Sequence, residues 1–144
     1  MKQITTLALA LVMSLCSFAK PVDSINGEIK ASFQKSFQHA QIISTEVRKG
    51  FTKLTFKMND AIMYAFYSEN GELLAVTRNI VSSQLPMSLM MSLKNEYAGY
   101  WITDLFEFSG DGLNSYYVSL ENADLKLVLR SNGDSWEVYA TSKK

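Results

Sequence analysis

The residues that could perform chemistry are few, and none stands in a catalytic or metal-binding pattern. His39 is the one histidine and Cys16 the one cysteine among 144 residues. A metal site needs several converging ligands, and histidine and cysteine are the usual nitrogen and sulfur donors. The sequence therefore predicts no metal site. His39 lies near the end of a predicted helix, where a histidine commonly faces water or a terminal carbonyl.

Carboxylates and hydroxyls give no clearer signal of catalysis. Most acidic residues fall in predicted turns, where they usually serve local backbone bonding and solubility. Asp111 and Asn114 lack the alternating oxygen ligands of a calcium loop. No Gly-x-Ser-x-Gly setting and no glycine-rich phosphate loop is present. A carboxylate pair for glycoside hydrolysis is defined by the distance between the two carboxyl groups in the folded protein, and nothing in the sequence singles out such a pair. We expect no enzymatic activity and no cofactor.

An export signal is predicted for residues 1–19. Lys2 supplies the positive start, an apolar run continues through Leu15, and Ser17 and Ala19 place small residues at the −3 and −1 positions of a cleavage site. The run is too short to anchor the chain across a bilayer. We expect cleavage after Ala19, leaving a single domain, 20–144, that is periplasmic or secreted and has no membrane span.

Charge and cysteine content narrow the possible partners. Lys and Arg number 14, as do Asp and Glu, so the chain lacks the basic excess that a nucleic-acid ligand requires. Cys16 lies in the predicted signal, so the exported chain would have no disulfide. The alternative is a lipid-modified Cys16, which the bulky Leu15 disfavours because lipoprotein cleavage motifs have Gly, Ala or Ser there.

The remaining residues divide into two similar units, about 24–80 and 83–141. Each begins with apolar residues four apart, the spacing of one helix stripe. The stripes are Ile25, Ile29, Phe33 and Phe37 in the first unit and Leu85, Leu89, Leu93 and Tyr97 in the second. Each stripe is followed by four short segments of strand character, at 41–48, 52–58, 62–68 and 73–79, and at 100–108, 115–120, 124–130 and 135–140.

The turns between these segments set the expected fold. They include Asn59-Asp60 and Asn132-Gly133, and Asn-Gly is a strong hairpin signal. Strands joined by tight turns must be antiparallel. The recurrence of the turns in the same order indicates duplication. We therefore predict an α+β fold, a tandem repeat of one helix plus four antiparallel strands, with the helices packed on one face of a shared antiparallel sheet.

The chain resembles the β-lactamase-inhibitor-like, PepSY-like family of small exported bacterial proteins, and the motifs that carry the resemblance lie in the second unit. The similarity rests on Leu85-Pro86, on the helix end from Leu93 to Tyr100, on the strand from Tyr116 to Leu120, and on the strand and Asn-Gly turn from Leu125 to Gly133. It extends over residues 25–139. The resemblance implies a helix-plus-sheet fold and export, and it supplies no catalytic residues.

One face of the expected sheet is predicted to be open. In the segment 125–130, leucines alternate with Lys126, Val128 and Arg130. The leucines must face the helix, so the alternate residues point outward. The same phase, carried to the other strands, places a set of basic and aromatic residues on this face, namely Lys53, Tyr64, Phe66, Tyr117, Lys126, Arg130 and Tyr139.

These residues have two interpretations. Aromatic cross-strand pairs can simply stiffen a sheet. Alternatively, Tyr and Arg are favoured interface anchors, and clustered exposed aromatics are uncommon without a use. We hypothesise a non-enzymatic module whose partner is another exported or envelope protein. The alternative function is a carrier or sensor of a small apolar or peptide ligand, held between the sheet and the linker Ile80 to Leu85.

Some large apolar residues have two possible places. Met87, Met90 and Met91 lie beside the buried stripe of the second helix, where they could fill core gaps or present an apolar outer face. Trp136 is predicted to face the core. Trp101 stands at a helix-to-strand entry and could serve either side.

Overall fold

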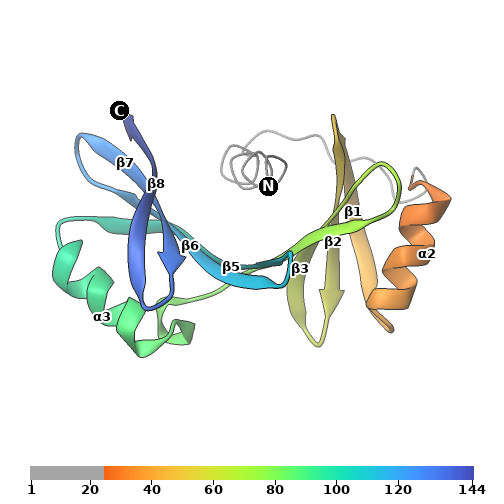
Figure 1. The fold of residues 1–144 in the computed structure, drawn as a ribbon, viewed down its shortest axis with the longest axis horizontal. Helices are drawn as coiled ribbons and strands as arrows, with labels where there is room; N and C mark the ends of the chain where they lie inside the picture. The colour runs from red at the N-terminus through yellow and green to blue at the C-terminus, as the bar shows by residue number, and fades with distance from the viewer. Residues whose placement is uncertain (1–24) are drawn as a thin grey trace.

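The computed structural model describes residues 25–144, so the predicted signal peptide lies outside the described residues (Figure 1). The elements are α2 (Gly27–Ser36), β1 (Gln41–Arg48), β2 (Phe51–Met58), β3 (Ala61–Tyr67), β4 (Leu73–Asn79), the 3-10 turn η2 (Ser82–Gln84), α3 (Met87–Glu96), β5 (Trp101–Gly110), β6 (Leu113–Glu121), β7 (Leu125–Asn132) and β8 (Ser135–Lys143).

Helix α2 forms where its apolar stripe is preceded by a capping residue. The Asn26 side chain accepts a hydrogen bond from the Glu28 N–H at 2.9 Å, which satisfies one of the free donors at the helix start. Ile29 and Phe33 are buried against the sheet. The stripe therefore fixes which side of α2 meets the strands.

Helix α3 follows the same logic without a side-chain cap. Pro86 precedes its first turn, a place where proline's missing N–H costs no hydrogen bond. Leu89 and Leu93 are buried, as their spacing predicts. The Trp136 indole N–H donates to the Leu89 carbonyl at 2.9 Å, so β8 holds this helix by a hydrogen bond as well as by packing.

The strands form a single sheet in which each pairs with its neighbour in the sequence. The order is β1 to β8, and every pair is antiparallel. Tight turns make this possible. Asn59 and Asp60 both adopt positive φ, 49° and 62°, the geometry of a hairpin turn whose twist matches the strands. Gly133, with φ 61°, closes the last hairpin.

The predicted fold class, an α+β tandem repeat of one helix plus four strands, is wrong. Strands hold 55% of the described residues, and the two helices have 10 residues each. The chain forms one continuous eight-stranded sheet, because β4 pairs with β5 through Val76 to Asn79. The middle of the sheet also has a core of its own, which two helix-covered units would not provide.

Three apolar clusters make up that core. The first lies between α2 and the sheet, and it includes Ile29, Phe33, Leu54, Phe56, Ala65 and Tyr67. The second lies beneath α3 and includes Ile80, Leu85, Leu93, Leu105, Val118, Leu120 and Leu129. The third, the central cluster, consists of Phe66, Ala75, Phe106, Phe108, Tyr117 and Val128 and lies on the face without helices.

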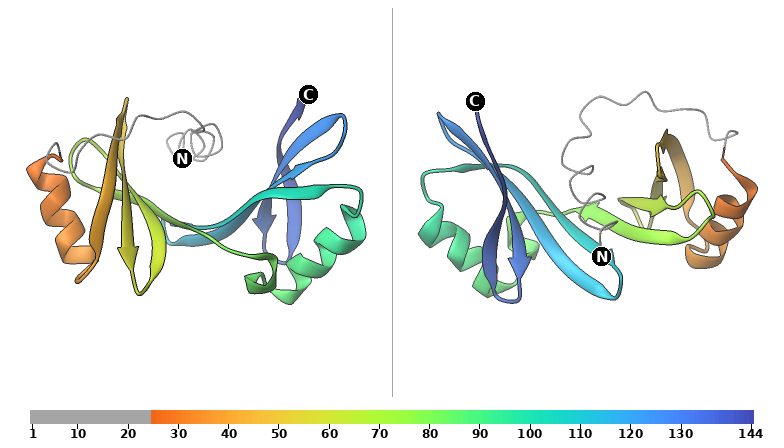
Figure 2. Two further views of the ribbon diagram at one scale, coloured as in Figure 1. Left: turned by 180° about the vertical axis from the view of Figure 1, so that it is seen from behind. Right: turned by 45° about the horizontal axis from the view of Figure 1, so that its top comes forward.

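The central cluster requires the sheet to be bent. Phe51 on β2 and Tyr139 on β8 both pack against it, although five strands separate them in the sheet. Figures 1 and 2 show this bend: the outer strands at the two ends rise on either side of a lower middle formed by β4 to β6. Twisted strands accumulate such curvature along a long open sheet.

The two helices are short. Within residues 25–144, neither is long and apolar enough to cross a membrane.

Candidate functional site

The seven predicted site residues lie on one face of the sheet, called here the open face. The register pairs Lys53 with Phe66 and Tyr117 with Arg130. Their sequence neighbours Leu54, Ala65, Val118 and Leu129 belong to the clusters beneath the helices. Side chains alternate between the faces of a strand, so the open face is the one turned away from α2 and α3.

The centre of the open face is sealed. Phe66 is 2% exposed and Tyr117 is 3% exposed. The Tyr117 ring stacks on Phe106 with centroids 5.2 Å apart and meets the Tyr139 ring edge-on at 5.6 Å. Burial raises the pKa of the Tyr117 hydroxyl, and the Arg130 guanidinium offsets part of that rise. Because so little of either ring is accessible, these side chains contribute mainly to folding.

Around the aromatic centre lie three groups, and in each of them a basic residue contacts both a carboxylate and an aromatic ring. The first is Lys53. Its ammonium lies 3.2 Å from a Glu46 carboxylate oxygen and 4.8 Å from the centroid of the Tyr64 ring. The Lys53 and Glu46 side chains are only 19% and 14% exposed, so this pair is largely enclosed.

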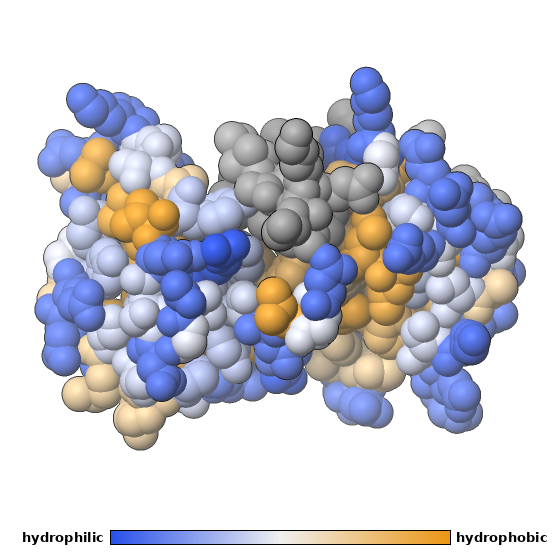
Figure 3. Space-filling model, viewed as in Figure 1, coloured by the Kyte–Doolittle hydropathy of each residue, from blue (hydrophilic) through white to orange (hydrophobic). Residues whose placement is uncertain are grey.

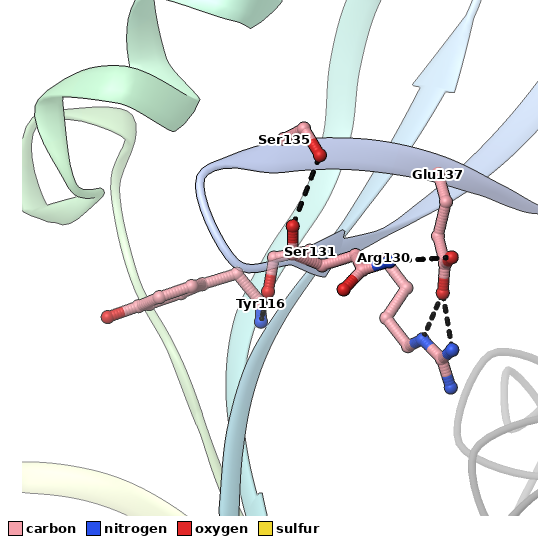
Figure 4. Close-up of polar contacts among 6 residues, drawn as sticks. Tyr116, Arg130, Ser131, Ser135 and Glu137 are labelled. Atoms are coloured by element: carbon pink, nitrogen blue, oxygen red, sulfur yellow. Dashed lines mark hydrogen bonds and ion pairs between the residues drawn. The ribbon is translucent and has the colours of Figure 1, made fainter.

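The second is Arg130 on β7. Its Nε donates to a Glu137 carboxylate oxygen at 2.8 Å, and Nη2 contacts the same oxygen (Figure 4). The guanidinium carbon lies 5.8 Å from the centroid of the Tyr139 ring. The next residue, Ser131, is buried. Its hydroxyl accepts a hydrogen bond from the Tyr116 N–H at 2.8 Å, which fixes this part of β7 to β6. The Arg130 and Glu137 side chains remain 42% and 38% exposed.

The third group joins two lysines through one carboxylate. Glu121 contacts Lys126 at 2.9 Å and Lys144 at 2.8 Å, and hydrogen bonds from Lys144 and Lys126 lower the pKa of this carboxyl. The Lys144 ammonium lies 4.8 Å from the centroid of the Trp101 ring, which is 52% exposed. Lys126 is 51% exposed, so this end of the open face is the more accessible one.

Apolar surface accompanies these charges. Figure 3, viewed as Figure 1, shows hydrophilic side chains at both ends of the molecule and hydrophobic side chains over the region of β1 to β3. Ile62, in register with Lys57 on the open face, is 43% exposed. A polar surface that surrounds partly exposed apolar residues is typical of protein interfaces.

The face that carries the helices has a comparable arginine–glutamate ion pair. The Arg78 Nε contacts a Glu107 carboxylate oxygen at 2.6 Å, and the two side chains are 46% and 24% exposed. Arg78 and Glu107 are partners in the β4–β5 register, between residues of the open face. This pair gives an internal reference for arginine–glutamate contacts on the sheet.

Sequence reasoning missed several members of the open face. The sequence left the face of Trp101 open because this residue stands at a helix-to-strand entry. The structure places it opposite Glu121, and a bulge between Ile102 and Asp104 breaks the strict alternation of β5. Glu46, Glu121 and Lys144 follow only from the observed pairing of strands. Phe106 and Phe108 could have been found from their alternation in β5.

The usual metal-ligating side chains are not gathered in the part of the chain that the structure describes. Residues 25–144 contain no group of three His, Cys, Asp or Glu side chains that could hold a metal ion. His39 is exposed and adopts a left-handed backbone, φ 67°, just after α2. The linker Ile80 to Leu85 does not stand off the sheet, because both named residues are buried in the cluster beneath α3.

No protein-family model and no curated protein matches the sequence. Solved structures match in fold. A DUF2874 family protein from Bacteroides uniformis superposes with a TM-score of 0.72 at 11% identity, covering 83% of this chain and 89% of that one. A BLIP-like protein from Bacteroides fragilis gives 0.68 at 12%, covering 82% and 85%. The chain has a BLIP-like fold.

A third similar structure comes from Bacteroides eggerthii and is proposed to be periplasmic. Its TM-score is 0.70 at 10% identity, covering 82% of this chain and 88% of that one. These identities show likeness of fold alone. None of the three bears on the PepSY-like part of the predicted resemblance.

Proposed function

We propose that this protein is an exported, non-enzymatic module that binds another exported or envelope protein through the open face. The observation that carries the proposal is the set of basic residues around the aromatic centre. Arg130, Lys126 and Trp101 are accessible, yet each is already oriented by a contact within the chain. A side chain held in place loses less entropy on binding, and Arg and Trp are common anchors of interfaces.

The rigidity of the surface supports a protein partner. The open face belongs to a continuous sheet whose centre is packed, so it offers a fixed shape. The exposed groups are of both charges and partly apolar, which suits a protein surface better than a polyanion. The BLIP-like fold of a similar structure agrees with this function, and the predicted signal together with the B. eggerthii protein supports a periplasmic location.

The experiment compares two arginines that differ mainly in their face. Arg130→Ala removes an ion-paired arginine from the open face, and Arg78→Ala removes one of similar exposure from the other face. Tagged wild type and both variants are used to capture proteins from native envelope extract, with quantitative mass spectrometry of the recovered proteins. We expect Arg130→Ala to lower recovery of a wild-type partner at least several-fold, and Arg78→Ala to leave it unchanged.

Melting temperatures of both variants are the control, since each loses one partly exposed ion pair worth little stability, about 0–1 kcal/mol. Equal recovery by both variants would contradict the proposal. Loss of recovery with Arg78→Ala alone would assign binding to the helix-bearing face.

The alternative of a small-ligand carrier is less well supported. The site imagined for it requires an apolar pocket beside the linker, but Ile80 and Leu85 are 8% and 7% exposed and fill the core beneath α3. Native mass spectrometry of the exported protein would reveal a retained ligand mass if this function were correct.

A further inference from the structure

Three of the seven methionines of the sequence lie in α3, within its first five residues. Met87, Met90 and Met91 are separated by three and four positions, so they share one side of the helix. At 100° per residue they span an arc of about 100°, and neighbours at these spacings have Cβ atoms about 5–6 Å apart. Their thioethers can therefore meet over a single helical turn.

This arc is not the buried side of α3. Leu89 and Leu93, which are 1% and 8% exposed, occupy the side that faces the sheet. Met87 is 68% exposed and Met91 is 45% exposed. Met90 lies at the flank and packs partly against the core. Two of the three methionines are thus largely accessible to solvent, and the third packs against the core beside them.

The ligand chemistry of such a group is specific. Thioether sulfur is a soft donor that selects Cu(I) and not the harder divalent cations. Methionine has no proton to lose, so its metal affinity does not depend on deprotonation as that of cysteine and histidine does. We propose that Met87, Met90 and Met91 form a three-thioether site for Cu(I), independent of the open face.

The electrostatic surroundings permit a cation there. The positive end of the α3 dipole would by itself disfavour one. The Ser88 hydroxyl, however, donates to the Asp134 carboxylate at 3.0 Å, which places a negative charge beside the first turn of the helix. The monovalent charge of Cu(I) also makes the cost smaller than for a divalent metal.

The test uses Ag(I), a redox-inert analogue of Cu(I), and the protein as residues 20–144, a stretch that contains no cysteine. Methionine methyl groups are labelled with 13C and assigned by single Met→Leu substitutions. We expect one equivalent of Ag(I) to shift the methyl signals of Met87, Met90 and Met91 and to leave those of Met58 and Met63 in place. The latter two pack beneath α2 and serve as internal controls.

Affinity measurements complete the test. The double variant M87L/M91L should lower the Ag(I) affinity at least tenfold, whereas M58L/M63L should not change it. Both replace methionine by a residue of similar volume, and their melting temperatures confirm folding. The wild-type affinity should be the same at pH 5 and pH 7.5. Equal shifts of all methionines, unchanged affinity in M87L/M91L, or a marked loss of affinity at pH 5 that would indicate His39, would each overturn the site.

Discussion

At the scale of single residues, the open face contains two kinds of side chain, buried and accessible to solvent. The alternation of residues along each strand places both kinds on this face. Phe66 and Tyr117 are sealed in the central cluster, whereas Arg130 and Lys126 reach solvent. Substituting the first kind changes folding, and substituting the second kind changes the surface. Experiments on binding therefore have to use the second kind.

Phe66→Ala should be a strongly destabilising change. The side chain is 2% exposed and contacts Phe51, with ring centroids 5.8 Å apart, so its removal leaves a cavity in the central cluster. We expect a loss of about 3–5 kcal/mol in the free energy of unfolding. Urea denaturation measures it, and a loss below 1 kcal/mol would mean that the residue is a surface side chain.

Tyr67 gives a pH-dependent prediction. It is fully buried, and burial raises the pKa of its hydroxyl to about 12. The nearby Ser32 side chain offsets part of that rise, but its geometry falls short of a hydrogen bond and the hydroxyl has no hydrogen-bond partner. The unfolded chain ionises first, near pH 10, so stability due to the neutral hydroxyl is lost as the pH rises from 10 through 12.

Tyr67→Phe removes both the unpaired hydroxyl and this titration. We expect the variant to be as stable as wild type or more stable at pH 8. Its advantage should grow by about 1 kcal/mol at pH 11, because one pKa unit corresponds to about 1.36 kcal/mol. Urea denaturation at pH 8 and pH 11 measures the difference in stability between the variant and wild type. A variant less stable than wild type at pH 8 would show that the Tyr67 hydroxyl makes a hydrogen bond in the folded protein.

At the scale of elements, α3 is held to β8 by specific contacts in addition to its apolar stripe. The Trp136 indole bonds to the Leu89 carbonyl, and Ser88 bonds to Asp134 in the last hairpin. These contacts connect residues 46 and 47 positions apart in sequence. They fix the helix relative to the sheet end that carries Arg130.

Trp136→Phe tests this connection. It keeps an aromatic ring but removes the N–H that donates to Leu89. The expected loss of stability is about 0.5–1.5 kcal/mol, plus a term for the smaller ring. Hydrogen exchange should accelerate for the amides of α3 before those of β1 to β4. Uniform acceleration throughout the chain would contradict a local role.

The elements themselves were largely readable from the sequence. The strands predicted at 41–48 and 73–79 coincide with β1 and β4. The turn predicted at Asn59-Asp60 separates β2 from β3. Five residues of the two predicted stripes are buried, namely Ile29, Phe33, Leu85, Leu89 and Leu93, and the other three, Ile25, Phe37 and Tyr97, are partly buried. What local patterns could not reveal was the central cluster, because it depends on long-range bending. They also could not place Trp101, whose register is shifted by a bulge.

At the scale of the whole molecule, the sheet joins both ends into one structure. β4 and β5 pair directly, and the central cluster draws side chains from β3 through β7. The tandem arrangement expected from the sequence failed at this scale, because helix-covered layers do not account for a core on the other face.

The continuity of the sheet predicts one cooperative unfolding transition. Phe33 lies on α2 and Leu89 on α3, and the two helices are at opposite ends of the sheet. Replacing either by alanine should cost about 2–5 kcal/mol. Each variant should still show a single transition at a lower temperature in calorimetry. Two separate transitions would mean that the ends fold independently.

The most direct test of the central claim, that the open face is the binding surface, is site-specific photocrosslinking in the native envelope. A benzophenone side chain is introduced at Lys126, 51% exposed on the open face, and at Arg78, 46% exposed on the other face. Light should produce a covalent adduct with a partner protein at position 126 and none at position 78. Adducts at position 78 alone, equal adducts at both positions, or no adduct at position 126 would contradict the claim.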